Sequence, residues 1–513
     1  MSSTLSKVFS GGIFGIDAFT VEIEVDAGHG DPKIVMVGLP DMAVKESQDR
    51  VWTALLNSGF APPPGRTTIN LAPADVRKEG PSFDLPIALG MLAATNQLNQ
   101  GALEPYTVIG ELALSGEVRK VKGILPVTLN AREEGRERII VPTSNAEEAA
   151  VVEGIEVYPA NNLRQVVEFL NGNEDIPAKR VDLESLFDVA SQYEVDFAEV
   201  KGQEYAKRAI EVAVAGGHNL LKIGPPGTGK TMIAKRIASI LPPMSLEEAL
   251  ETTKIHSIAG ILPAKQALIG KRPYRSPHHT VSDAGLLGGG AYPVPGEVSL
   301  AHHGILFLDE LPEFARNVLE VMRQPLEDGQ VTISRAAATV TFPCQFMLVA
   351  AMNPCPCGYH GDLQRECRCS PKQITSYRNR ISGPLLDRID IHIEVPSVNY
   401  NELSSMEPGE PSSVIRERVI RARKTQQERF SDLPHVHCNA NMGARELAKY
   451  GLLQPEAQEM MKMAINELNF SARAYDRILK VSRTIADLAA SETIEGEYVA
   501  EAIQYRTLDR QLW

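Results

Sequence analysis

The chain has 513 residues, which predicts about three domains at roughly 100 to 200 residues each. Apolar residues make up 43% and charged residues 23%, values typical of a soluble globular protein and not of a disordered one. The net charge of −13 excludes a protein that is basic throughout and coats nucleic acid. The longest apolar run, near residues 346–352, is far shorter than the roughly 18 residues a membrane helix needs. The N-terminus shows no secretory signal, so we expect a cytoplasmic protein.

The first third of the chain alternates strand-like and helix-like runs. Strands are predicted at residues 34–37, 67–71, 139–141 and 155–158, and helices at residues 47–58, 85–93, 146–152 and 163–170. A polar, turn-forming stretch at residues 171–177 ends this pattern. We therefore predict an α+β domain over residues 1–175, followed by a linker over residues 176–199.

Residues 200–400 have the pattern of an α/β domain. Short apolar runs at residues 220–223, 305–308 and 346–350, interrupted only by the lysine at position 222, indicate buried parallel strands separated by helices. After residue 400 the strand-like runs stop, and helical periodicity continues to about residue 502. The sequence therefore predicts an α/β domain over residues 200–400 and a helical domain over residues 401–513.

A phosphate-binding loop is predicted directly after the first of these strands. Gly224-Pro-Pro-Gly-Thr-Gly-Lys-Thr231 matches G-x-x-x-x-G-K-[ST] between an apolar strand and a helical run. The lysine of this motif reaches the β- and γ-phosphates, and the hydroxyl of the last residue faces Mg²⁺. The alternative is a simple Gly/Pro turn. The predicted nucleotide-binding residues are Gly224, Pro225, Pro226, Gly227, Thr228, Gly229, Lys230 and Thr231.

Two further strand ends carry polar residues suited to nucleotide hydrolysis. Asp309 and Glu310 follow the strand at residues 305–308, where Asp309 would complete the Mg²⁺ shell and Glu310 would deprotonate the attacking water. Asn353 follows the strand at residues 346–350 and would hold that water. The alternatives are an exposed strand terminus for the acidic pair and a turn-capping role for Asn353.

An arginine in Gly383-Pro-Leu-Leu-Asp-Arg388 could stabilise phosphoryl transfer from a neighbouring subunit. The alternative for Arg388 is an ion pair within the chain, to Asp387 or Asp390.

The order of these motifs resembles the AAA+ ATPases. Arg275-Ser-Pro-His-His-Thr280 and Gly285-Leu-Leu-Gly-Gly-Gly290 narrow the resemblance to the magnesium-chelatase-like group. Val37-Gly-Leu-Pro-Asp41 and Gly80-Pro-Ser-Phe-Asp-Leu-Pro86 look like the ComM/YifB family, and the resemblance extends over essentially the whole chain. It implies an α/β fold: an AAA+ P-loop core, an N-terminal Lon-protease-like α+β domain and a C-terminal helical lid. It also implies ATP and Mg²⁺, a homohexameric ring, and a DNA helicase that promotes branch migration while transforming DNA is integrated.

The family resemblance assigns roles to particular residues. The subunit's own nucleotide would be served by Lys230, Thr231, Asp309, Glu310 and Asn353. Arg388 looks like the trans arginine finger, and Gly202 with Gln203 resembles the segment near adenine. Arg473 resembles the sensor-2 arginine, with Arg477 one turn later as the rival.

Two insertions are candidates for DNA contact. Residues 330–342 form two period-2 runs with Arg335 near the turn, which indicates a β-hairpin. In similar helicases such a hairpin projects into the pore, where arginines meet the phosphate backbone; the alternative is a structural hairpin with a solvated arginine. Residues 257–304 resemble the family's helix-2 insert, and from it we predict DNA contacts by Lys271, Arg272 and Arg275. A basic run at residues 414–430 is interpreted as a solvated helix face.

Four cysteines crowd into one short segment after Asn353. Cys355, Cys357, Cys367 and Cys369 form two C-x-C pairs, and four thiolates suit tetrahedral Zn²⁺. The alternatives are free thiols or an oxidised pair. A closed four-thiolate site has no open position for catalysis, so we predict a structural zinc.

The N-terminal domain raises a second function, because Ser82 stands where Lon has its nucleophile. A Ser–Lys dyad needs a lysine base, and Leu125 occupies that position, with Lys122 displaced by three residues. We therefore expect no protease activity. A further alternative is a chelatase-like ATPase that remodels a protein partner, although the true chelatase ATPase lacks this N-terminal domain.

Overall fold

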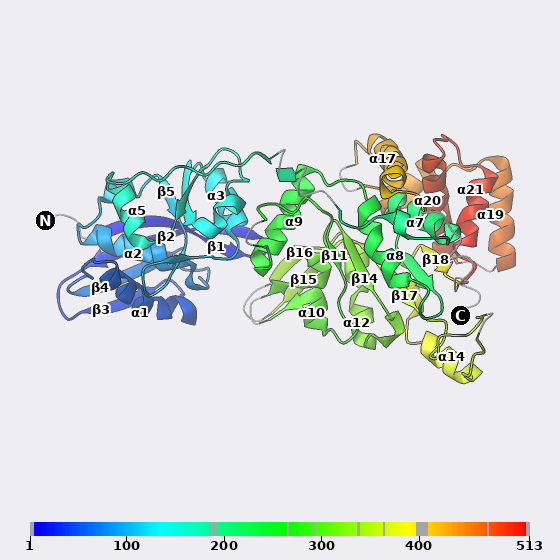
Figure 1. The fold of residues 1–513 in the computed structure, drawn as a ribbon, viewed down its shortest axis with the longest axis horizontal. Helices are drawn as coiled ribbons and strands as arrows, with labels where there is room; N and C mark the ends of the chain where they lie inside the picture. Colours follow the sequence, from blue (N-terminus) through cyan, green and yellow to red (C-terminus); the bar gives the residue numbers. More distant parts are fainter. Residues whose placement is uncertain are drawn as a thin grey trace. The chain divides into compact units, whose positions relative to one another are not determined.

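The computed structural model describes residues 5–183, 186–187, 193–263, 266–290, 293–335, 339–362, 365–396, 409–433, 436–468 and 471–508. These residues form two compact units, coloured in sequence order in Figure 1. The first unit comprises Met1–Ser191, Leu246–Gly270 and Ala338–Thr341, and the second comprises Gln192–Ser245, Lys271–Ala337 and Phe342–Trp513. The predicted boundary between residues 400 and 401 lies outside the described residues. Within the described ranges, no helix is long and apolar enough to cross a membrane.

The first unit is built on a seven-stranded sheet with the order β3-β4-β2-β1-β5-β8-β9. Its strands are β1 (Leu5–Phe14), β2 (Asp17–Ala27), β3 (Lys33–Val37), β4 (Arg66–Ala72), β5 (Tyr106–Val108), β8 (Arg138–Pro142) and β9 (Glu156–Ala160). β6 (Glu111–Leu112) and β7 (Val118–Arg119) form a separate short pair. The predicted strands are confirmed as β3, β4, β8 and β9, whereas the long antiparallel hairpin β1–β2 was not predicted.

Helices cover this sheet and fill its core. They are α1 (Met42–Asn57), α2 (Asp84–Ala94), α3 (Ile124–Glu133), α4 (Ala146–Ala149), α5 (Leu163–Leu170) and α9 (Leu246–Ala259). α1 begins where the Asp41 carboxylate accepts a 2.7 Å hydrogen bond from the Val44 N–H, a typical N-cap. Every residue of α2 is buried, which explains why its sequence is apolar all round and not along one stripe. α9 lies far along the chain, yet it belongs to this unit: Lys254 pairs with Asp17 at 2.8 Å.

The second unit contains a five-stranded sheet with the order β11-β14-β17-β10-β18, and all its strands are parallel. The strands are β10 (Leu220–Ile223), β11 (Tyr274–Arg275), β14 (Ile305–Leu308), β17 (Met347–Met352) and β18 (Ile391–Glu394). The three strands predicted from apolar runs are confirmed as β10, β14 and β17. Because parallel strands share their carboxyl edge, the residues that follow β10, β14 and β17 come together at one edge.

Short elements connect these strands. The helices are α7 (Glu204–Gly216), α8 (Lys230–Ile237), α10 (Asp283–Leu287), α11 (Glu297–Leu300), α12 (Arg316–Val321), α13 (Arg323–Asp328), α14 (Pro371–Arg378) and α15 (Gly383–Leu386), with the 3-10 turn η6 at Leu311–Glu313. β12 (Gly288–Gly289) pairs with β13 (Val294–Pro295). β15 (Gln330–Ser334) and β16 (Thr339–Pro343) form a two-stranded sheet, which confirms the predicted hairpin.

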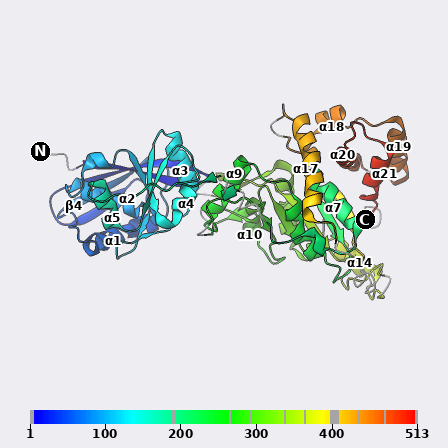
Figure 2. The same cartoon turned by 45° about the horizontal axis from the view of Figure 1, so that its top comes forward.

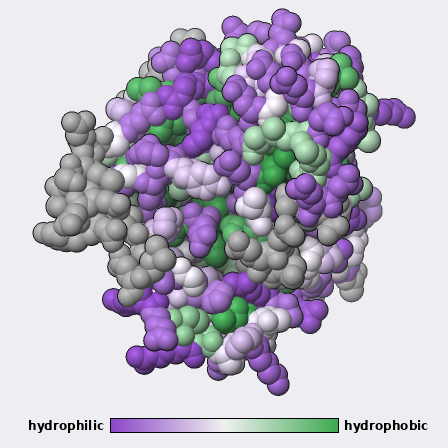
Figure 3. Space-filling model, turned by 90° about the vertical axis from the view of Figure 1, so that its right-hand side faces the viewer, coloured by the Kyte–Doolittle hydropathy of each residue, from purple (hydrophilic) through white to green (hydrophobic). Residues whose placement is uncertain are grey.

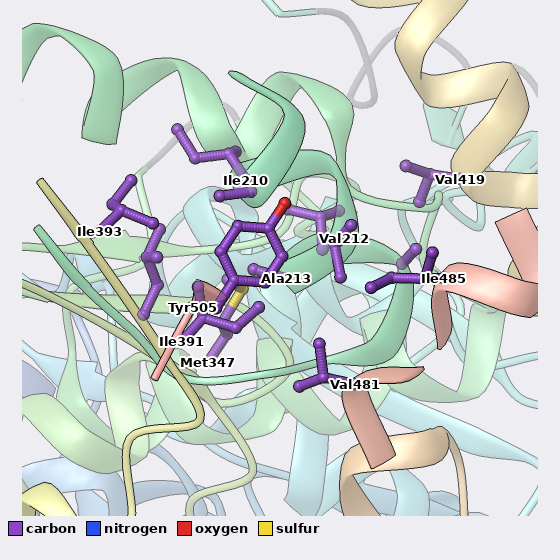
Figure 4. Packing of buried hydrophobic residues seen from close by; sticks show 14 of the residues in the cluster. Ile210, Val212, Ala213, Met347, Ile391, Ile393, Val419, Val481, Ile485 and Tyr505 are labelled. Atoms are coloured by element: carbon purple, nitrogen blue, oxygen red, sulfur yellow. The ribbon is translucent and has the colours of Figure 1, made fainter. Parts of the chain in front are cut away.

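The C-terminal part is helical, as predicted. It consists of α17 (Ser412–Arg429), α18 (Ala444–Tyr450), α19 (Pro455–Leu468), α20 (Ala472–Leu488) and α21 (Gly496–Gln504), and Figure 2 shows α17 running beside α7. Figure 4 shows part of the core that these helices share with the parallel sheet: Ile391 of β18 and Met347 of β17 lie beside Tyr505, and Val419 of α17 and Ile485 of α20 belong to the same cluster. The face seen in Figure 3 is mainly hydrophilic, with apolar residues in small groups.

Candidate functional site

The loop between β10 and α8 has the backbone that a phosphate-binding loop requires. Gly227 and Gly229 adopt φ values of 83° and 80°, which L side chains rarely adopt. At Gly224 a Cβ atom would lie 2.2 Å from the carbonyl oxygen of Val395, so only glycine fits there. The motif therefore folds as predicted, directly after a buried strand and at the start of a helix, where backbone N–H groups attract anions.

Lys230 lies within this loop and reaches the end of the neighbouring strand. Its Nζ donates to the carbonyl oxygens of Gly224 and Pro225, both at 2.7 Å, and to Oδ1 of Asn353 at 3.2 Å. Burial lowers the pKa of the lysine, while the nearby Asp309 carboxylate opposes this shift. The structure thus brings together the lysine and the amide that the sequence placed 123 residues apart.

A hydroxyl and two carboxylates complete this edge of the sheet. Thr231 Oγ1 donates to Asp309 Oδ2 at 2.6 Å, and the Glu310 backbone N–H donates to Asp309 Oδ1 at 3.0 Å. Glu310 adopts a left-handed φ of 53°, which turns the chain sharply after β14 and leaves its side chain half exposed. His279 Nδ1 lies 3.5 Å from Glu310 Oε2. Hydroxyl and carboxylate oxygens are the hard donors Mg²⁺ prefers, so Thr231 and Asp309 fit this ion.

Gln203 also reaches the loop. It precedes α7 with a left-handed φ of 55°, next to Gly202 at 63°. Its Nε2 donates to the Thr228 carbonyl at 3.0 Å. Its Oε1 is buried and has no hydrogen-bond partner among the described residues. An unsatisfied buried acceptor beside the phosphate loop fits a ligand with an amino donor, such as adenine.

Arg388 is not presented to solvent in this structure. Its side chain is 7% exposed, forms an ion pair with Glu327 of α13, and donates to the carbonyl of Pro384. The predicted alternatives for this ion pair were Asp387 and Asp390, but Glu327 is the observed partner. Burial lowers the pKa of Arg388, and the charges of Arg323, Arg473 and Arg477 lower it further.

The two sensor-2 candidates have different surroundings. Arg473 is 67% exposed and lies 3.4 Å from the Asp387 carboxylate. Arg477 donates to the buried carboxylate of Asp390 at 2.5 Å, and His218 contacts the other oxygen of that carboxylate at 3.1 Å. Burial alone would raise the pKa of Asp390, but Arg477 and His218 outweigh it and lower that pKa. Arg477 thus holds α20 against the sheet, and Arg473 is the arginine free to move.

The predicted DNA-contacting residues divide into two kinds. Arg335 is exposed at the end of β15, and its Nη2 lies 3.7 Å from where a Cβ of Gly289 would be, so the hairpin and the glycine-rich insert adjoin. Arg272 instead donates to the carbonyls of Pro242 (2.6 Å) and His303 (2.7 Å).

The other two basic residues of this insert also have partners within the chain. Arg275 forms a two-bond pair with Glu297, at 2.7 Å for each bond. Lys271 is half-buried, with Nζ 6.0 Å from the centre of the Tyr193 ring. These contacts hold the insert in place and leave its cations little freedom to reach a ligand.

The basic run on α17 is only partly a solvated face. Arg416 donates to the carbonyl of Ser239, Arg418 pairs with Glu410 at 2.6 Å, and Arg429 pairs with the buried Asp487 at 2.5 Å. Most of these arginines therefore attach the helix to its own unit.

The four predicted metal-binding cysteines converge. The Sγ atoms of Cys355, Cys357, Cys367 and Cys369 all lie within 4.8 Å of one another. Cys355 and Cys357 each lie 3.7 Å from Cys367, close to the roughly 3.8 Å edge expected for zinc–sulfur bonds of about 2.3 Å in a tetrahedron. The N–H groups of Tyr359 and Arg368 donate to the Cys357 sulfur and lower its pKa, whereas burial and the neighbouring sulfurs raise the pKa of Cys367 and of Cys369. All four cysteines are free of disulfides, and the set fits a structural zinc.

Sequence reasoning missed Lys222. This lysine lies inside the apolar strand β10, is fully buried, and donates to the Lys230 carbonyl at 2.6 Å. Its Nζ is 5.2 Å from the centre of the Phe307 ring on β14. Burial lowers its pKa from 10.5 to about 7. A lysine in the middle of a buried strand, two residues before the first glycine of the loop, is the signal that would have identified it.

The comparisons with known proteins agree with this geometry. Three family models match the chain: subunit ChlI of magnesium chelatase over residues 23–145, magnesium chelatase subunit ChlI over residues 196–403, and its C-terminal part over residues 409–506. Over a parallel sheet with a phosphate loop, these matches define a magnesium-chelatase-like AAA+ protein.

Two relatives match along their whole length. The chain is 45% identical to Competence protein ComM of Haemophilus influenzae, covering 99% of both chains. It is 44% identical to protein YifB of Salmonella typhimurium, covering 99% of this chain and 98% of YifB. A partial match of 26% identity over 141 residues links it to Lon protease 2 of Bacillus subtilis, covering 27% of this chain and 25% of the protease. The chain therefore belongs to the ComM/YifB family.

Proposed function

We propose that this protein is an ATP-dependent DNA motor, a ring-shaped helicase that promotes branch migration of recombination intermediates. One observation carries the ATPase part of the proposal: Lys230, Asn353 and the Thr231–Asp309 pair meet at the carboxyl edge of one parallel sheet. This is the arrangement that phosphoryl transfer needs, because catalysis there depends on positioned charges more than on covalent chemistry.

Each residue of this edge has a distinct part in the proposal. The phosphate loop holds the nucleotide phosphates through its backbone N–H groups, and Lys230 neutralises the β- and γ-phosphates. Thr231 and Asp309 hold the ion; Mg²⁺, when bound, offsets the charge that develops on the phosphates. Glu310 removes a proton from the attacking water, and Asn353 orients that water. Gln203 offers its buried Oε1 to the base.

We propose roles for three arginines in a ring-shaped assembly. Arg388 acts on the nucleotide of a neighbouring subunit in a homohexamer, which requires its ion pair with Glu327 to open on assembly. Arg473, which is exposed at the start of α20, serves as the sensor-2 arginine. Arg477 positions that helix through Asp390.

We place the DNA contact at Arg335, because it is exposed on a hairpin. Of the other predicted contacts, Arg272 and Arg275 have partners within the chain, so we assign these two to holding the insert. Lys271, whose Nζ lies 6.0 Å from the centre of the Tyr193 ring, stays a proposed DNA contact. The name of the full-length relative, a competence protein, supports a role in integrating transforming DNA. Such DNA is recombined in the cytoplasm, where we place the protein.

We assign a structural zinc to the four cysteines. The ion would fix the loop between Asn353 and α14 and so hold the Asn353 amide in the position where it orients the water. The alternatives, free thiols or an oxidised pair, do not by themselves account for the convergence of four sulfur atoms.

A proteolytic function has one point in its favour, the partial match to Lon protease 2. At the position expected for the lysine base, however, Leu125 is fully buried on α3, where an apolar side chain packs into the core. We therefore propose that the first unit guides DNA and does not cleave peptides.

The test compares ATP hydrolysis without DNA, with single-stranded DNA and with a branched junction, for wild type and Glu310→Gln. We expect DNA to stimulate wild-type hydrolysis, and we expect the variant to bind ATP while hydrolysing it at least about 100-fold more slowly. A wild-type rate that DNA leaves unchanged would refute the DNA motor and favour a chelatase-like ATPase that remodels a protein partner.

A further inference from the structure

A polar hollow of about 980 Å³ lies in the second unit between η6 and α14. Neither the nucleotide site nor the β-hairpin accounts for it. The side chains that line it include Glu313, Arg316, Lys372, Ser376, Asn379 and Arg380. Most of these side chains are exposed, so the hollow opens to solvent.

The lining carries an excess of positive charge. Arg316, Lys372 and Arg380 are opposed by one carboxylate, Glu313, which pairs with Arg380 at 2.7 Å. Arg316 and Lys372 form no ion pair among the described residues. Lys372 is therefore available to an anionic ligand, Arg316 is available in competition with the nearby Glu320 carboxylate, and Arg380 becomes a third cation if the ligand displaces Glu313.

One face of α14 provides hydrogen-bond donors beside these cations. Lys372, Thr375, Ser376 and Asn379 follow one another at helical spacing and line the same hollow. The hydroxyl of Ser376 and the amide of Asn379 have no hydrogen-bond partner among the described residues. The lining offers no exposed aromatic ring, because Phe314 is 3% exposed.

The cations and hydrogen-bond donors of the hollow indicate which ligand it can bind. Arg and Lys together with Ser, Thr and Asn are the side chains that contact phosphate oxygens in protein–DNA complexes. The lining has no exposed aromatic ring on which bases could stack, so its contacts would be to phosphate oxygens, which carry no sequence information. We propose that this hollow binds the phosphate backbone of a single DNA strand, and that Arg316, Lys372 and Arg380 are its cationic contacts; this rests on the proposed DNA motor.

The hollow is physically connected to the hydrolysis site. η6 begins at Leu311, directly after Glu310, and Arg380 donates to the Pro312 carbonyl of that turn at 3.2 Å. On the other side, Tyr377 of α14 is buried and accepts a hydrogen bond from the backbone N–H of Asn353. A DNA strand that displaces Glu313 from Arg380 would change the contacts of η6, which directly follows Glu310. It would also change the contacts of α14, which touches Asn353 through Tyr377. DNA binding in the hollow would therefore change the rate of ATP hydrolysis.

The experiment measures binding of a fluorescein-labelled oligo-dT by the full chain with a non-hydrolysable ATP analogue, at 50 to 200 mM salt. Each lost phosphate contact lowers the slope of log affinity against log salt by about 0.7 for a single strand. We therefore expect Lys372→Ala to lower the slope by about 0.7, and Arg316→Ala with Lys372→Ala by about 1.4. Over this fourfold salt range the double variant would lose about sevenfold less affinity than wild type.

The matched control is Arg421→Ala with Lys424→Ala, which removes the same charge from exposed positions on α17. We expect this control to keep the wild-type slope and the wild-type ATPase rate. Equal slopes for the hollow variant, the control and wild type would overturn the proposal, as would a hollow variant that changes hexamer assembly but not the slope. Failure of this inference can be distinguished from failure of the proposed function. A wild-type ATPase rate that ignores DNA refutes the motor, whereas a DNA-stimulated wild type with unaltered variant slopes refutes only the hollow.

Discussion

The buried lysine behind the phosphate loop should make the stability of this protein depend on pH in a way that one substitution removes. Lys222 is fully buried and its pKa is lowered from 10.5 to about 7, because burial disfavours the charged ammonium. In the unfolded chain the same lysine keeps its proton up to its ordinary pKa. Between about pH 7 and pH 10 the unfolded state therefore binds more protons, and the folded state gains stability as the pH rises.

The size of the effect follows from the pKa. The fall from 10.5 to about 7 corresponds to at most about 5 kcal/mol over the full range, and to about 2 kcal/mol between pH 7 and pH 9. Lys222→Met keeps the volume of the side chain but cannot titrate. The stability of wild type relative to this variant should therefore rise by about 2 kcal/mol from pH 7 to pH 9, which is a few degrees in melting temperature for a unit of this size.

The assay is differential scanning calorimetry of both proteins at pH 7, 8 and 9. Lys207→Met is the matched control, since Lys207 is also nearly buried but has a carboxylate partner, Glu204, at 2.9 Å. The control measures how much of any pH-dependent difference comes from replacing a nearly buried lysine as such. Melting temperatures of wild type and Lys222→Met that change in parallel with pH would refute the reasoning, because the buried ammonium would then carry no proton-linked penalty.

Four further outcomes are expected. Cys355→Ser should abolish stoichiometric zinc, measured by atomic emission, and lower the melting temperature, because three thiolates hold the ion less tightly than four; wild-type protein purified without zinc would contradict the assignment. Arg477→Ala should destabilise the protein by about 3 kcal/mol or more in urea unfolding, since it leaves the Asp390 charge buried without its guanidinium partner. Arg473→Ala should leave stability within about 0.5 kcal/mol but slow hydrolysis, and the reverse pattern would exchange the two roles. Arg335→Ala should reduce the stimulation of ATPase by DNA and keep the rate without DNA, and undiminished stimulation would remove the hairpin from the DNA surface.

The nucleotide site was predictable because its parts follow from local rules. The loop needs glycine at the left-handed positions 227 and 229, the strands before Asp309 and Asn353 are continuously apolar, and the strand before Gly224 is apolar except for Lys222. Parallel strands then place their carboxyl ends together. No tertiary information was needed to expect Lys230 near Asn353, although the 3.2 Å contact between them is a result of the fold.

The contacts of individual arginines were not predictable in this way. Arg388 and Arg272 look alike as isolated cations, and their sequence neighbours indicated a finger and a DNA contact. Their observed partners, Glu327 and the carbonyl oxygens of Pro242 and His303, are decided by which segments pack together. The hairpin β1–β2 was missed for a local reason: Gly11 and Gly12 interrupt the alternation of apolar and polar residues in β1.

The sequence by itself determined the family, the parallel P-loop sheet and the residues at its carboxyl edge, because these depend on backbone geometry and on the periodicity of apolar residues. Only the tertiary structure decided which charges are free. It attaches Arg477 and Arg275 to carboxylates, buries Lys222 beneath the loop, and leaves Arg473, Arg316 and Lys372 exposed. The physical reason is that the environment of a charge is set by contacts between residues far apart in the chain, and that environment determines whether the charge stabilises the fold or remains available to a ligand.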